Sequence, residues 1–189
     1  MAKIVQFKPR AKLSSSENLK QFIQLCRDQL TVFGPELEWG AVTWPSIIAF
    51  AKLGVSTRKP NREQTMDSEY IEFAKSYFRY QQGMKPTKVR NEGRALRALE
   101  AALIQVNGSA RIDGLSISVL DEAVQLGKQH YSDGVAYQCG RELERLALFV
   151  SDNKLIPRDL SGWKNPLKRM QDKNRTGSEA RKQRETGLP

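Results

Sequence analysis

Five basic side chains crowd one short stretch of this sequence, and their spacing points to phosphate recognition. The stretch MKPTKVRNEGRALRAL, residues 84–99, has a single acidic residue, Glu92, and its basic residues are Lys85, Lys88, Arg90, Arg94 and Arg97. On a helix with about 100° between successive residues, one polar face collects Thr87, Arg90, Asn91, Arg94 and Arg97. Such side chains can hydrogen-bond phosphates and base edges in the major groove of DNA.

A second face of the same kind is expected near residue 140. Its polar members are Tyr137, Gln138, Arg141 and Arg145, opposite Val135, Cys139, Leu143 and Leu146. Glu142 and Glu144 make this face less uniformly basic. Gly93-Arg94-Ala95-Leu96 and Gly140-Arg141-Glu142-Leu143 are similar, and Gly93 or Gly140 is expected to let two helices cross closely. The alternative is that each glycine simply lies on a boundary between the faces of its helix. The alternative stays open that each face is the solvated side of an amphipathic helix.

Both faces belong to a predicted four-helix domain at residues 67–157. Asp67 is expected to cap its first helix and Thr87 its second, which runs to about Val106 before Asn107-Gly108. Ser118 and Asp121 are expected to open the third helix, and Ser132-Asp133-Gly134 to turn the chain into the fourth. Short turns between four amphipathic helices predict an all-α bundle.

A smaller helical module is predicted before this domain, at residues 14–56. Ser14 and Glu17 have capping-box spacing, and apolar residues then recur at helical steps up to Gly34-Pro35. A short helix is expected from Ser46 to Leu53, and the polar residues 57–66 are expected to be a linker.

Most of the net charge of +10 lies at the two ends of the chain. Residues 1–13 have four basic residues and no acidic one, and residues 158–189 have nine basic and four acidic ones. These ends are predicted to be a basic N-terminal arm and a basic C-terminal linker. The high charge favours a polyanionic partner, either nucleic acid or an anionic membrane surface.

Other chemistry lacks its usual sequence signals. Cys26 and Cys139 lie among apolar residues with no CxxC or Cys/His cluster, so neither a metal nor a cofactor is expected. No phosphate-binding glycine loop or nucleophile elbow occurs, and no apolar run reaches the roughly 18 residues of a membrane span. The N-terminus has no apolar signal-peptide core, and a cytoplasmic location without membrane association is expected.

Three segments together resemble the core-binding region of tyrosine site-specific recombinases, the phage integrase family. They are FAKSYFRYQQGMKPTKVRNEGRALRALEAAL, YQCGRELERLALFVSDNKLIP and WKNPLKR, and the resemblance covers roughly residues 67–189. It implies a SAM-like helical bundle that clamps one side of duplex DNA, with the small N-terminal helical module as an addition. DKNRTGSEARKQRETGLP resembles the lead into a catalytic domain.

The resemblance implies sequence-directed binding of double-stranded DNA at a recombination or attachment site, in support of DNA integration and recombination. Other recombinase protomers on the DNA are possible further partners. The implied DNA-binding residues are those of the two faces and of the linker: Lys85, Thr87, Lys88, Arg90, Asn91, Arg94, Arg97, Tyr137, Gln138, Arg141, Arg145, Lys164, Lys168 and Arg169.

The catalytic set of that family is not matched in this chain. It requires an arginine, a lysine, a His-x-x-Arg pair, a further His or Trp and a tyrosine nucleophile. The one histidine, His130, is not followed by arginine three positions on. No residue is therefore expected to be catalytic, and no strand cleavage is expected. The alternative function is a helical protein–protein interaction module with nonspecific basic tails, which would contact partners through Trp39, Trp44 or residues 46–53.

Overall fold

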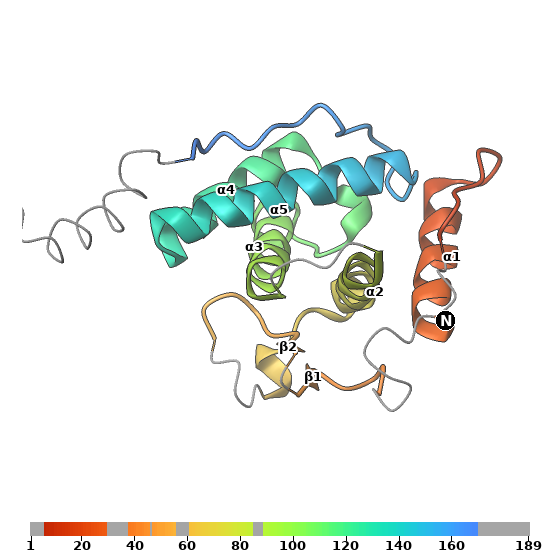
Figure 1. Ribbon diagram of the computed structural model, residues 1–189, viewed down its shortest axis with the longest axis horizontal. Coiled ribbons are helices and arrows are strands. Elements are labelled where there is room, and N and C mark those ends of the chain that lie inside the picture. Colours follow the sequence, from red (N-terminus) through yellow and green to blue (C-terminus); the bar gives the residue numbers. More distant parts are fainter. Residues whose placement is uncertain (1–5, 30–37, 46, 56–60, 85–88, 170–189) are drawn as a thin grey trace, which may run out of the picture.

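The computed structural model describes residues 6–29, 38–45, 47–55, 61–84 and 89–169. Within these ranges the fold is mainly helical, as predicted, with one small sheet in addition (Figure 1). The α-helices are α1 (Ser15–Asp28), α2 (Ser68–Met84), α3 (Val89–Asn107), α4 (Ile117–His130) and α5 (Asp133–Asp152). Short 3-10 turns lie at Arg62–Gln64 and Ile112–Gly114.

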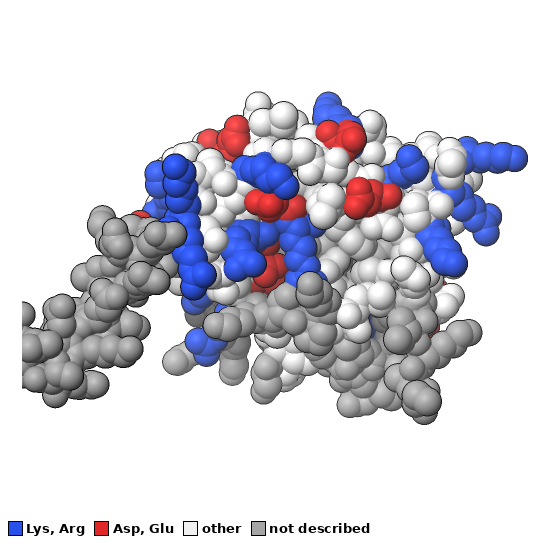
Figure 2. Space-filling model, turned by 45° about the horizontal axis from the view of Figure 1, so that its top comes forward, with Lys and Arg blue, Asp and Glu red and all other residues white. Residues whose placement is uncertain are grey.

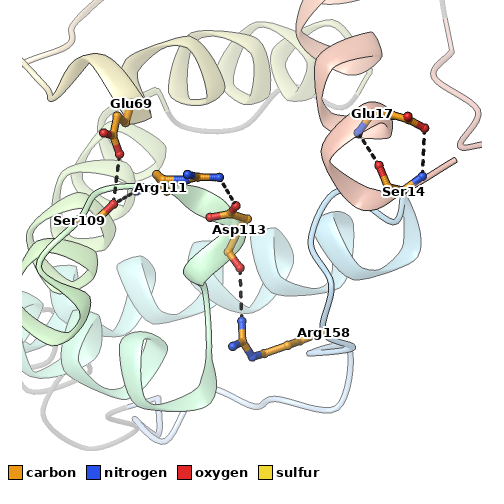
Figure 3. A network of polar contacts seen from close by, with 7 residues as sticks. All are labelled: Ser14, Glu17, Glu69, Ser109, Arg111, Asp113 and Arg158. Atoms are coloured by element: carbon orange, nitrogen blue, oxygen red, sulfur yellow. Dashed lines mark hydrogen bonds and ion pairs between the residues drawn. The ribbon is translucent and has the colours of Figure 1, made fainter.

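Several helix boundaries follow from local capping chemistry. Ser14 forms the predicted capping box with Glu17, each side chain accepting the other's backbone N–H at 3.2 Å (Figure 3). Asp67 accepts from the backbone N–H of Glu69 at the start of α2, as expected. Gly108, at φ +74°, ends α3 at the predicted place.

Two boundaries differ from the prediction. Helix α1 ends at Asp28 rather than near Gly34-Pro35, and residues 30–37 lie outside the described ranges. Helix α4 is capped by Ser116 rather than Ser118, because Ser116 is extended and its hydroxyl accepts from the backbone N–H of Val119 at 3.3 Å. The predicted cap Thr87 lies outside the described residues.

The prediction of a short helix from Ser46 to Leu53 is wrong, because this segment contains the strand Ile48–Ala49. Strands β1 (Thr43–Trp44) and β2 (Ile48–Ala49) pair antiparallel, with Thr43 opposite Ala49 and Trp44 opposite Ile48. The chain continues from β2 into an isolated bridge between Ala51 and Thr65. Aromatic and β-branched residues such as Ile47, Ile48 and Phe50 suit an extended chain.

One hydrophobic cluster joins every helix and the hairpin. It runs from Phe7 through Phe22, Trp44 and Tyr77 to Trp163 in the chain after α5. Helix α1 packs against α2, and α3 packs against α4 and α5. The core therefore does not stop at the predicted boundaries 57–66 and 157.

The two predicted basic ends are partly packed onto the domain. Near the N-terminus, the backbone N–H of Phe7 donates to the Tyr80 hydroxyl at 3.0 Å, and Phe7 is buried. After α5, the chain turns back along this helix toward the end where α5 begins (Figure 1). Arg158 donates to the carbonyls of Asp113 and Leu115, and Figure 3 shows the first of these contacts. Residues 6–13 and 158–169 thus belong to the folded unit.

Within the described ranges, none of the helices combines the length and apolar character of a membrane-spanning segment.

Candidate nucleic-acid interface

Helix α3 presents the predicted polar face on the side opposite the core. Leu96, Leu99 and Leu103 are fully buried, whereas Arg90 is exposed and Arg94 is half-buried. The helical spacing therefore separates these two kinds of side chain as the sequence predicts. Lys85 and Lys88, expected at the start of this helix, lie with Thr87 outside the described residues.

Two arginines of this face are held by neighbouring elements. The guanidinium carbon of Arg94 lies 5.5 Å from the centroid of the Tyr131 ring, a cation–π geometry. Arg97 Nη2 donates to the carbonyl oxygen of Ala49 in β2 at 3.1 Å. Burial lowers the pKa of Arg97, and the neighbouring charge of Arg94 also lowers it, although Tyr131 opposes both. Arg97 therefore lies under the hairpin, deeper than the rest of the face.

Helix α5 carries the second predicted face, with mixed charge. Cys139, Leu143 and Leu146 are buried in the core, while Arg141 is exposed and Arg145 half-buried. Arg145 Nη1 lies 3.8 Å from Glu142 Oε2. Burial raises the pKa of Glu142, and the charges of Arg145 and Arg141 lower it. The acidic side chains of α5 thus offset part of its positive charge.

The two faces meet in one surface hollow. This hollow has a volume of about 520 Å³ and lies between the first turns of α3 and of α5. Arg90, Asn91 and Arg94 line it from α3, and Gln138 lines it from α5. Residues nearly fifty positions apart in the sequence are therefore brought to one place on the surface.

The chain after α5 extends this surface with further basic residues. A hollow of about 680 Å³ is lined by Tyr137 and Arg141 of α5 together with Lys168 and Arg169. A smaller one of about 270 Å³ lies beside Arg141, Arg145 and Lys164. Figure 2 shows Lys and Arg side chains gathered over α5 and the chain that follows it, with acidic side chains between them.

We name the combined surface the α3–α5 face. It consists of Arg90, Asn91, Arg94, Tyr137, Gln138, Arg141, Arg145, Lys164, Lys168 and Arg169. Seven of these residues are lysine or arginine, and the acidic residues beside them are Glu142 and Glu144. Glu144 lies 3.6 Å from Lys164 Nζ, so that lysine has a carboxylate partner.

Asn165 holds the chain after α5 in place, although the sequence analysis did not single it out. Its backbone N–H donates to Glu144 Oε2 at 2.9 Å, and its Nδ2 donates to the Tyr137 carbonyl at 3.2 Å. The carboxamide rests on Gly140, where a Cβ atom would overlap it. The Asn-Pro pair beyond a helix and the glycine inside the helix were the available signals.

The prediction that Gly93 or Gly140 lets two helices cross closely is therefore wrong. Gly140 makes room for Asn165 in an irregular segment rather than for a crossing helix. A Cβ atom on Gly93 would lie 3.1 Å from Cδ1 of Ile48, so Gly93 makes room for the hairpin. Both glycines permit a close approach, but helix–helix packing is not the cause.

Among the described residues, no group of three or more His, Cys, Asp or Glu side chains is arranged to hold a metal ion. Cys26 and Cys139 are both free thiols in the core.

Comparisons of this chain with protein-family models, with curated proteins and with solved structures find no match.

Proposed function

We propose that this chain binds double-stranded DNA through the α3–α5 face. The observation that carries the proposal is the shared hollow of α3 and α5, where Arg90, Asn91, Arg94 and Gln138 converge. Guanidinium groups pair with phosphate oxygens, while Asn and Gln amides can read base edges. The hollow therefore combines groups that position a protein on DNA with groups that can distinguish sequences.

The arrangement of charge supports this proposal more than the net charge does. The lysines and arginines of the α3–α5 face come from two helices and from the packed segment after them. A surface that spans three segments can contact several phosphates at once, and each contact releases a counterion from the duplex.

In its finer form, the proposal is that the chain is the DNA-binding part of a tyrosine recombinase. It would recognise a recombination or attachment site in support of DNA integration, beside other protomers, without cutting a strand itself. The cytoplasm is the proposed location. The resemblance of the sequence segments supports this form.

The alternative function is a helical protein–protein interaction module. Most of the apolar residues that it would use to contact a partner are buried inside this fold. Trp44, Ile48 and Phe50 are buried in the core, and Trp39 is half-buried, with its indole N–H bonded to Glu72 at 2.7 Å. If the duplex-binding test described below fails, an acidic protein becomes the alternative partner for the α3–α5 face.

The test compares two double variants that remove the same charge. Arg94→Ala with Arg141→Ala alters the α3–α5 face, whereas Lys20→Ala with Arg27→Ala removes two exposed cations of α1. Fluorescence anisotropy on a labelled duplex should give a loss of about 2–6 kcal/mol in binding free energy for the first variant, at about 1–3 kcal/mol for each contact. The α1 variant should bind nearly as the unaltered chain does. Equal affinity of the two variants would contradict the proposal.

A further inference from the structure

A second groove adjoins the hollow shared by α3 and α5, along α3 and beneath the β1–β2 hairpin. We name it the hairpin groove; its volume is about 420 Å³. Thr43 and Ile47 line it from the hairpin, and Arg90, Gly93, Arg94 and Arg97 line it from α3. One water molecule occupies ~30 Å³ in the liquid. The volume of the groove is roughly ten times larger, so the groove has room for a hydrated ion.

The charges in this groove are all of one sign. Arg90, Arg94 and Arg97 recur at helical steps of four and three, so they form one stripe along α3. The lining residues that the structure describes contain no aspartate or glutamate. Burial lowers the pKa of Arg97 and repulsion from Arg94 lowers it further, although Tyr131 opposes both, so the charged form of Arg97 is disfavoured there.

An anion would relieve both the repulsion and the burial cost. Arg97 uses Nη2 to hold the Ala49 carbonyl, while its buried Nε–H has no hydrogen-bond partner within the described residues. A buried donor without a partner costs about 1–3 kcal/mol. An oxyanion with several acceptor oxygens could bond this Nε–H and the neighbouring guanidinium groups together.

We propose that the hairpin groove is a phosphate-binding seat, formed by Arg90, Arg94 and Arg97 under the hairpin. The hairpin supplies one wall, and the small Gly93 lets Ile48 approach α3 closely. Arg90 and Arg94 also line the hollow shared with α5, so the two cavities adjoin through the same side chains. A phosphate of the duplex backbone is the proposed source, and that choice rests on the proposed function.

The test titrates the full chain with pyrophosphate by isothermal titration calorimetry. Thr43→Glu places a carboxylate among the three arginines, where it should take the position proposed for the bound phosphate. Thr43→Gln has nearly the same size without charge, and Gln21→Glu adds the same charge on exposed α1. We expect Thr43→Glu to weaken pyrophosphate binding at least about tenfold, as for loss of one charge-assisted bond, and the two controls to change it little.

Two readouts separate a changed site from a damaged fold. Thr43→Glu should raise the melting temperature, because its carboxylate compensates the buried charge of Arg97, and unfolding cannot then explain lost binding. In the unaltered chain, the Nε–H resonance of Arg97 should shift on addition of pyrophosphate. A chain that does not bind pyrophosphate, or binds it equally well with Thr43→Glu, would overturn the phosphate seat.

Duplex binding by the same variants distinguishes the source of the phosphate. Weaker binding of both ligands by Thr43→Glu would support a backbone phosphate in the seat. Loss of pyrophosphate alone would support the seat and overturn the duplex as its source. Pyrophosphate binding by a chain that binds no duplex would support the seat and contradict the proposed function instead.

Discussion

The carboxamide of Asn165 occupies the position that a Cβ atom on Gly140 would take, and this close approach holds the returning chain against α5. The same carboxamide donates to the Tyr137 carbonyl and accepts from the backbone N–H of Leu167 at 3.1 Å. Because Lys164 and Lys168 flank this contact in the sequence, it also determines where two cations of the α3–α5 face lie.

A side chain at position 140 should therefore displace the returning chain. Gly140→Ala is expected to lower the free energy of unfolding by about 1–3 kcal/mol, the usual cost of inserting a methyl group into a packed site. Gly127→Ala in α4 is the matched control, since a Cβ atom there meets nothing within 4 Å. The control should gain up to about 1 kcal/mol from helix propensity. Urea unfolding measures both, and equal changes would contradict the account of Gly140.

The two residues should also be coupled in a double-mutant cycle. Asn165→Ala removes the group that a Cβ atom on Gly140 would overlap, so Gly140→Ala should cost much less in that background. The expected coupling free energy is about 1 kcal/mol or more, within the range for residues in contact. Additive effects in the urea unfolding of the four chains would show that the contact does not transmit the clash.

Glu100 should make the stability of the fold depend on pH. It is 1 % exposed, its Oε2 accepts from the backbone N–H of Asp67 at 2.5 Å, and burial raises its pKa from 4.5 to about 7. The folded state therefore favours the protonated acid. Its contribution to stability is fully present below about pH 4.5 and is lost as the pH rises through 7, a change of about 3 kcal/mol.

Glu100→Gln retains an acceptor without the charge, so it should remove this part of the pH dependence. Urea unfolding should show that, relative to the unaltered chain, the variant is about 2–3 kcal/mol more stable at pH 8 than at pH 5. Glu122→Gln, which removes a partly exposed carboxylate of α4, should retain the original decline. A constant difference between Glu100→Gln and the unaltered chain at both pH values would contradict the prediction.

The two thiols should be unreactive in the folded chain. Burial raises the pKa of Cys26 far above its ordinary value and that of Cys139 to about 12, so little thiolate exists at neutral pH. Iodoacetamide should label neither cysteine in native buffer and both in urea. Rapid labelling of either cysteine without urea would reveal local opening of the core.

The sequence predicts the features that depend on neighbours along the chain. The Ser14 capping box, the end of α3 at Gly108 and the separation of arginines from leucines on α3 all follow from residues within about one helical turn. The error at residues 46–53 has a different cause. A short apolar run fits a buried strand as well as a helix, and only the pairing of Trp44 with Ile48 decides between them.

The remaining features depend on contacts between distant segments. The bond from Arg97 to the Ala49 carbonyl spans 48 positions, and the contact of Asn165 with Gly140 spans 25 positions. The hollow between α3 and α5 likewise requires the relative placement of two helices. Spacing alone could identify the arginines that take part, but not which of them lie under the hairpin and which remain exposed.

The fold also determines which shortened chain is suitable for a binding experiment. Removing residues up to 13 or beyond 157 would delete the core residues Phe7, Leu160 and Trp163. A chain ending at Arg169 retains the described core and the whole α3–α5 face. It loses only residues 170–189, which contain five basic and three acidic side chains.

The most direct test is the salt dependence of duplex binding by the full chain and by the chain ending at Arg169. Fluorescence anisotropy from low to moderate salt gives the slope of log K against log salt concentration, at about −0.9 for each phosphate contact. If the α3–α5 face binds DNA, both chains should bind with slopes of about −4.5 to −6.3, as for roughly five to seven contacts. Loss of binding on removal of residues 170–189 would contradict that claim, because the charge responsible would then lie in those residues rather than on the α3–α5 face.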